Sequence, residues 1–365
     1  MREITISAEF EGKNMTDRTV ELNHGRPFKP SLVDRFNIWV ENLPVRAWIF
    51  YLVFVVLLIL VQIIFLWMES GLLEEQLLPI IIFNGLATPF TLALIHILDN
   101  RAVTALNSMR PVLNTTKLEF DLNKYKLANM PYPRSLVSGL TLMVLVMIME
   151  RIWVVPIRYA ALDQLPTFTV VYHVIDKSTA FMMGVFIYHT IRQLRMVNTI
   201  NSKHVQINLF NLGPLQSFSR LTGSTAVGLV VGVYGWMLIN PDLMKDRTMI
   251  GFIVLFTILA VMVFVCPLYG VHRGMVATKE RALHEIDLNF EAVFSNFNTG
   301  IRDEDYSAIE KLNPTITSLE IQHNRISDIP TWPWRPETAR FALTAIALPL
   351  VLSILRFLVE LAFGW

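Results

Sequence analysis

The stretch WIFYLVFVVLLILVQIIFLW, residues 48–67, decides the fold, because none of its residues carries a charge. An α-helix rises about 1.5 Å per residue, so a run of this length spans the roughly 30 Å hydrocarbon core of a bilayer. Trp48 and Trp67 bound the run, and indole rings prefer the headgroup level of a membrane. The stretch therefore predicts a transmembrane helix.

The rest of the chain has the same character. Hydrophobic residues make up 53% and charged residues 17%, against about 25% charged residues in a soluble domain. The sequence predicts an all-α polytopic membrane protein with seven spans, arranged as repeated helical hairpins and a closing helix, and with a cytoplasmic helical hairpin and short strands. Prolines in the second span predict either a kink or a re-entrant segment. The seven expected spans are 47–67, 77–98, 135–156, 167–190, 223–240, 248–271 and 340–363.

Lysine and arginine in the connections predict the orientation. They are frequent before the first span and in the second, fourth and sixth connections, and the 68–76 loop has none. We expect a multi-pass protein of the plasma membrane with a cytoplasmic N-terminus. The expected parts are an N-terminal segment (1–45), six spans (46–272, with cytoplasmic connections near 99–134 and 190–222), a cytoplasmic helical hairpin (273–335) and a seventh span (336–365).

A short pattern recurs where three spans begin. Pro133, Pro214 and Pro336 are each followed seven residues later by Leu-Thr. Proline suits the first turn of a helix, so the pattern predicts repeated hairpins, although chance similarity among apolar segments would look the same. The returning spans end near His96, His189 and His272. We interpret them as amphipathic rings at the membrane interface and not as metal ligands, because no paired ligand spacing accompanies them.

Short elements are expected at the cytoplasmic surface. Alternation of apolar and polar residues in 3–10, 117–122 and 204–210 predicts short strands. Residues 31–42 predict a helix lying in the membrane interface, with an apolar face of Leu32, Phe36 and Trp39.

The 273–335 segment predicts a pair of amphipathic helices. Apolar residues recur at helical spacing through 273–297, and Asn298-Thr299-Gly300 is typical of a helix end and turn. Asn313 and Pro314 predict the cap and first position of a second helix. Two such helices would form an antiparallel hairpin.

Ionisable residues inside the expected spans are candidate functional groups, because an unpaired charge at membrane depth costs several kcal/mol. Their expected depths place them in the outer half of the membrane, where they could line one polar pocket. Their charges cancel, so the alternative is that they pair and lock the helices together. The predicted polar cluster is Glu150, Arg151, His173, Asp176, Lys177, Arg356 and Glu360.

The leading functional hypothesis is a non-enzymatic membrane protein that moves a small solute or ion through this polar cluster. The alternative is a membrane sensor or scaffold whose hairpin (273–329) docks a partner. An intramembrane enzyme using Glu150, His173 and Asp176 is the least favoured, because no catalytic motif is found. A net charge of +1 gives no reason to bind nucleic acid, and no cofactor or metal is indicated. The expected partners are the lipid bilayer, a second copy of the chain and a cytoplasmic protein.

Overall fold

The computed structural model describes residues 27–71, 77–152, 165–203, 207–239, 247–302 and 306–363. The described part of the chain is predominantly helical and contains no β-strand, and an isolated antiparallel bridge joins Pro30 and Pro131. The elements are α2 (Leu32–Glu41), α3 (Ala47–Ser70), α4 (Leu78–Met109), η1 (Arg110–Val112), α5 (Lys117–Ala128), α6 (Tyr132–Ile152), α7 (Pro166–Lys203), α8 (Ser217–Ile239), α9 (Arg247–Val265), η4 (Cys266–Leu268), α10 (Tyr269–Arg302), α11 (Tyr306–Ser327) and α12 (Pro336–Phe363).

Four helical segments are long and apolar enough to cross a bilayer, which is compatible with an integral membrane protein. They are Ala47–Ser70, Leu78–Val112, Pro166–Asn201 and Ile253–Thr299. The second expected span is an uninterrupted helix that runs through Pro89, and not a re-entrant segment. Helices α6, α8 and α12 lie at the other three expected spans, but they are not among these four, so seven crossings and the hairpin arrangement stay predictions.

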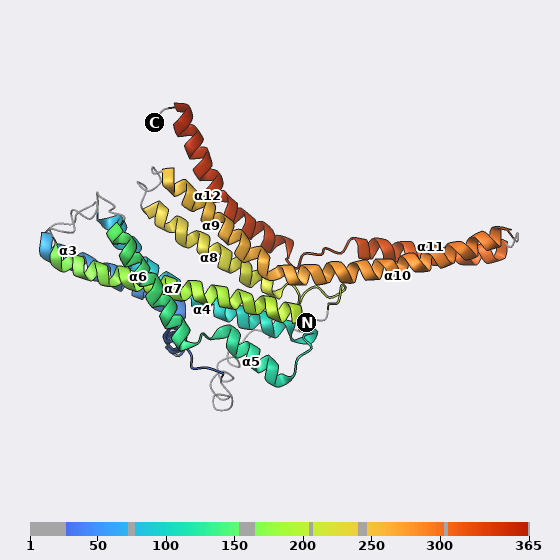
Figure 1. Cartoon of the computed structure of the whole chain (residues 1–365), viewed down its shortest axis with the longest axis horizontal. Coiled ribbons are helices and arrows are strands. Elements are labelled where there is room, and N and C mark those ends of the chain that lie inside the picture. Colours follow the sequence, from blue (N-terminus) through green and yellow to red (C-terminus); the bar gives the residue numbers. More distant parts are fainter. Residues whose placement is uncertain are drawn as a thin grey trace, which may run out of the picture.

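Helix α7 lies at the centre of the bundle and contacts α3, α4, α5, α6, α8 and α10 (Figure 1). Small residues bring α6 and α7 close together: a Cβ added at Gly184 would lie 2.5 Å from the carbonyl oxygen of Ser138. Ser138 Oγ also donates to the carbonyl of Gly184 at 2.8 Å. Close backbone approach with interhelical hydrogen bonds is the usual way in which helices associate inside lipid.

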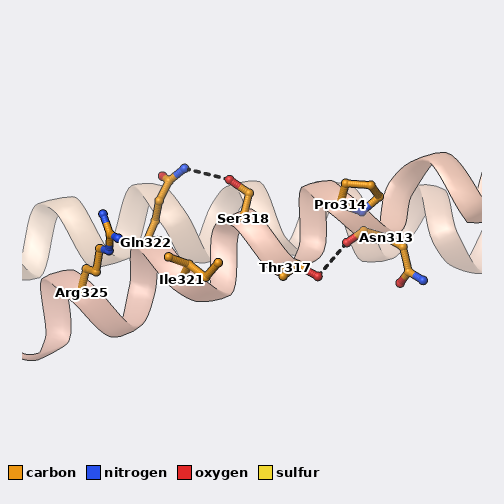
Figure 2. A pocket seen from close by; sticks show the side chains of 7 residues that line it. All are labelled: Asn313, Pro314, Thr317, Ser318, Ile321, Gln322 and Arg325. Carbon is orange, nitrogen blue, oxygen red and sulfur yellow. Dashed lines mark hydrogen bonds between the residues drawn. The ribbon is translucent and has the colours of Figure 1, made fainter.

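Helices α10 and α11 form an arm that projects from the bundle (Figure 1). A small core holds the arm together, and it comprises Leu209, Ile286, Leu319 and Ile326. The helices extend further than the sequence indicates. Helix α10 continues through 298–300 to Arg302, and α11 begins at Tyr306, so Pro314 lies inside it and not at its first position. Figure 2 shows this region, where Thr317 Oγ1 donates to the carbonyl of Asn313 at 3.1 Å.

The predicted strand at 117–122 is wrong, because these residues begin helix α5. A capping box starts this helix: Glu119 N–H donates to Thr116 Oγ1 at 3.2 Å, and Thr116 N–H donates to Glu119 Oε2 at 3.1 Å. These bonds satisfy backbone N–H groups that have no partner in the first turn of a helix. They stabilise the helical conformation more than a short alternation of apolar and polar residues favours a strand. Residues 207–210 form no strand either, and residues 3–10 and 204–206 lie outside the described part.

Candidate functional site

The predicted intramembrane cluster is described only on α7. Lys177 Nζ lies 2.8 Å from Asp176 Oδ2, and both side chains are partly exposed. His173 Nδ1 is buried and has no hydrogen-bond partner among the described residues. The side chains of Glu150, Arg151, Arg356 and Glu360 lie outside the described part. Helix α6 contacts α7, whereas α12 packs against α8 and α9 and diverges from α6 towards its C-terminal end (Figure 1). A single pocket formed by the whole set therefore stays a prediction.

A different group of ionisable side chains is buried between α2, α3, α4 and α7. Helix α2 begins with a capping box, in which Ser31 Oγ accepts from Asp34 N–H at 3.1 Å. Asp34, Asn37 and Glu41 follow one another at helical spacing on the face of α2 that packs on the bundle, and Asp34 is only 3% exposed. These three residues meet side chains of α3, α4 and α7. We call the whole set the buried acid–imidazole cluster; it comprises Asp34, Asn37, Glu41, Tyr51, His96, Asp99 and His189.

Asp34 ties α2 to a distant part of the chain. Its Oδ2 accepts hydrogen bonds from the backbone N–H groups of Ser31 and Met130, both at 2.8 Å, while Oδ1 is buried with no hydrogen-bond partner among the described residues. Burial and, to a lesser extent, the nearby Asp99 raise the pKa of Asp34 to about 6. The two backbone donors and His189 oppose this shift of the pKa. Asp34 is therefore a carboxyl group that titrates close to physiological pH.

His189 on α7 faces Asp99 on α4. The His189 side chain is fully buried, and its Nε2 lies 3.2 Å from Asp99 Oδ1. These two atoms are within ion-pair distance but lack the alignment of a hydrogen bond, and neither ring nitrogen bonds to another described residue. Gln193, one helical turn further along α7, donates to Asp99 Oδ1 at 3.4 Å and to the carbonyl of Leu127 at 3.3 Å.

His96 lies one turn before Asp99 on α4 and joins α2 to α3. Its Nε2 is 3.0 Å from Glu41 Oε1, and its Nδ1 is 3.1 Å from the Tyr51 hydroxyl, which donates to Asn37 Oδ1 at 3.2 Å. Tyrosine has one proton to donate, so when it is given to Asn37 both His96 nitrogens act as donors and the ring is positive. When His96 is neutral, Tyr51 can donate to Nδ1 instead. The network thus accommodates two arrangements of protons.

Arg192 of α7 lies beside the cluster, and the carboxyl groups of Asp34 and Asp99 act electrostatically on its guanidinium. Arg192 donates to the carbonyl of Asn129 at 2.6 Å. Its guanidinium carbon lies 5.2 Å above the ring of Phe28, and the neighbouring cation Arg134 is exposed.

His272 occupies a different environment at the base of the arm. Its Nδ1 donates to the carbonyl of Thr331 at 3.1 Å, because a carbonyl oxygen can only accept. The ring stacks on Trp332 with centroids 4.0 Å apart, and Trp332 stacks on Trp334, whose ring reaches Phe264 on α9. This histidine belongs to an aromatic stack and not to the buried acid–imidazole cluster.

Sequence reasoning found His96 and His189 but missed the acidic partners. Asp99 lies three residues after His96, so both face the same side of α4, and this spacing was a usable signal. The acidic and amide stripe on the opposite face of 31–42 was a second signal. The proximity of His189 to Asp99 had no local signal, because it arises from the packing of α7 on α4.

Two open depressions lie elsewhere on the described part of the chain, and neither is lined by residues of the cluster. The depression in Figure 2 is lined only by side chains of α11, namely Asn313, Pro314, Thr317, Ser318, Ile321, Gln322 and Arg325. A second open groove lies between α4, α6 and α7, and it is lined by Thr88, Met143, Val174, Lys177, Ser178, Phe181 and Met182. Within the described residues, no three histidine, cysteine or acidic side chains are arranged to hold a metal ion.

Comparison of the chain with protein-family models, with curated proteins and with solved structures finds no significant match. The four apolar helical segments are compatible with an integral membrane protein.

Proposed function

We propose that the chain is an integral membrane protein that moves a small ion or solute and that binds protons at the buried acid–imidazole cluster. His189 carries the proposal. It is a titratable ring with no exposed surface, it makes no hydrogen bond to the described residues, and it lies within 3.2 Å of a carboxylate oxygen. Acid and imidazole side chains in the membrane part of a protein are typical of proton relays.

Asp34 supports the same proposal. Burial raises the pKa of this carboxyl group to about 6, so it offers a further site for a proton within the same group. The cluster thus contains a carboxyl group that gains and loses a proton close to physiological pH.

Helix α7 provides a physical connection to the predicted transport residues. It carries both His189 and the Asp176–Lys177 pair; Lys177 lies 12 residues earlier, which corresponds to about 18 Å along the helix. The open groove beside Lys177 lies between α4, α6 and α7. A change in charge at His189 therefore acts on the same helix that lines this groove.

Reconstituted liposomes test the proposal. Pyranine trapped inside the vesicles reports proton entry driven by a potassium diffusion potential. We expect the wild-type chain to carry a proton flux and His189→Gln to reduce it at least tenfold, because glutamine keeps the approximate volume but does not titrate. His323→Gln is the matched control, since His323 lies 3.9 Å from Asp287 in an exposed pair on the arm. A wild-type proton flux equal to that of empty vesicles would refute the proposal that the cluster relays protons across the membrane.

A sensor or scaffold is the second candidate, and the projecting arm favours it. Leu288, Phe294, Ile301 and Ile321 leave large apolar surfaces exposed on α10 and α11. Helix α10 also packs against α7, so the base of the arm contacts the helix that carries His189. A spin label at position 288 should then change mobility between pH 5 and pH 7.5, and the change should vanish in His189→Gln. A label that is insensitive to pH in the wild type would exclude this candidate.

A further inference from the structure

We infer that the outer face of α2 is a docking surface for anionic lipid headgroups, and that it couples the membrane surface to the buried acid–imidazole cluster. Helix α2 packs a mixed face on the bundle, where Val33 and Val40 are buried beside Asp34 and Asn37. Leu32 and Trp39 on the opposite face are more than half exposed. Large apolar side chains on the outward face of a short amphipathic helix are typical of a helix that lies on a membrane.

The two faces of α2 follow the same spacing. The inner stripe is Asp34, Asn37 and Glu41, and the outer stripe is Leu32, Arg35 and Trp39, in each case at i, i+3 and i+7. Arg35 is exposed, and it lies between the two apolar side chains of the outer stripe. Its long stem can lie along apolar surface while the guanidinium reaches a phosphate group at the headgroup level.

Neighbouring aromatic residues support a lipid partner over a protein partner. Trp39 packs edge-on against Phe50 of α3, with ring centroids 5.5 Å apart, and Trp48 at the start of α3 is 61% exposed. The outer face of α2 is thus continuous with the exposed apolar surface of a candidate membrane span. Indole rings at the end of such a span are typical of the layer between headgroups and acyl chains.

Lipid binding at the outer stripe is coupled to the cluster because both stripes belong to the same short helix. Asp34 of the inner stripe and Arg35 of the outer stripe are adjacent in sequence. A lipid that fixes Arg35 therefore also fixes the position of the Asp34 carboxylate, which accepts a hydrogen bond from Met130. Release of α2 would expose Asp34, Glu41 and His96 to water. Lipid binding should therefore stabilise the hydrogen bond between Asp34 of α2 and Met130. It should also alter proton binding by the cluster, and this second effect rests on the proposed function.

Spin-label accessibility tests the lipid contact without any transport assay. Cys266, an exposed cysteine, is replaced by serine, and a nitroxide label is attached at Ile38→Cys on α2 or at Asn324→Cys on the arm as a control. The protein is placed in nanodiscs of phosphatidylcholine alone or mixed with phosphatidylglycerol. We expect the label at 38 to be several-fold more accessible to oxygen, relative to a water-soluble nickel complex, than the label at 324.

Phosphatidylglycerol should increase this ratio at position 38 and slow hydrogen exchange of the Met130 amide. Arg35→Gln should abolish both responses, while Arg281→Gln, an exposed arginine on the arm, should leave them unchanged. Inorganic phosphate added to phosphatidylcholine discs should reproduce neither response, because it lacks the acyl chains. Equal nickel accessibility at 38 and 324, or a phosphatidylglycerol response that survives Arg35→Gln, would overturn the inference. Either result can occur whether or not the protein carries protons.

Discussion

Asp34 on α2 accepts a 2.8 Å hydrogen bond from the backbone N–H of Met130, which lies 96 residues later in the chain. The antiparallel bridge between Pro30 and Pro131 lies beside it, and Tyr132 N–H donates to the carbonyl of Lys29 at 3.1 Å. One carboxylate thus fixes both the start of α2 and the entry to α6. The protonation of this group should determine how firmly the two segments are joined.

Asp34→Asn should remove a dependence of α2 docking on pH. The pKa of Asp34 is about 6 when α2 is docked and 3.8 when the group is hydrated, so docking is strongest below pH 4 and weakens as the pH rises to about 6. The shift corresponds to roughly 3 kcal/mol. Hydrogen exchange of residues 31–41 should therefore be slower at pH 4.5 than at pH 7 in the wild type, after correction for intrinsic rates, and should vary less in the variant.

The control for this experiment is Asp287→Asn, which removes an exposed carboxylate from the arm. It should leave the pH profile of α2 unchanged. Equal pH profiles for the wild type and Asp34→Asn would show that another group controls the docking.

Tyr51→Phe should destabilise the bundle, because it removes the hydroxyl that connects Asn37 to His96. Buried polar atoms left without partners cost about 1–3 kcal/mol. Thermal unfolding in detergent should begin several degrees lower than in the wild type. Tyr269→Phe alters an exposed tyrosine in the same way and should have no such effect. A melting temperature unchanged by Tyr51→Phe would indicate that the network contributes little to folding.

Gly184→Ala should separate α6 from α7. The added Cβ would lie 2.5 Å from a carbonyl oxygen and 3.0 Å from the Cα of Gly139, and backbone atoms cannot move aside as a flexible side chain can. Forcing extra volume into such a contact costs about 1–3 kcal/mol. Gly251→Ala is the matched control, since nothing lies within 4 Å of its added Cβ. Similar melting temperatures for the two variants would contradict the close packing described here.

Trp332→Leu should loosen the base of the arm, because it interrupts the stack between His272 and Trp334. Aromatic pairs contribute about 1 kcal/mol beyond their buried area. Distances between spin labels on the arm and on the bundle should become more broadly distributed. Trp67→Leu, at a largely exposed tryptophan of α3, should leave the distribution unchanged. An equally narrow distribution in both variants would mean that the stack does not orient the arm.

Hydropathy locates long apolar helices because a long uncharged run is a local property of the sequence, and four of the seven expected spans coincide with helical segments long and apolar enough to cross a bilayer. The run from Trp48 to Trp67 lies inside α3, and α4 continues through Pro89 without a break. The strand predicted from the alternation of apolar and polar residues in 117–122 is wrong, because six residues are too few to distinguish the period of a strand from that of a helix. The capping box of Thr116 and Glu119 adds two hydrogen bonds that favour the helix.

The buried cluster is harder to predict because its members come from four helices. Each side chain alone resembles an ordinary interfacial residue in the sequence: His189 lies at the end of the expected fourth span, and Asp34 lies near the start of a short helix. Only the packing of α7 on α4 brings His189 to Asp99 and makes both of them costly to bury. Their chemistry is therefore a property of tertiary structure and has no motif of its own.

The order of synthesis gives α2 an unusual position. The ribosome completes its acidic stripe before any of the groups that later cover it, since Met130 and His189 follow it in the chain. Until those groups arrive, Asp34 and Glu41 have water as their natural partner, while Leu32 and Trp39 on the other face already favour lipid. The inner face of α2 is therefore synthesised before the groups that cover it, so its burial depends on the later docking of the 129–132 segment and α7.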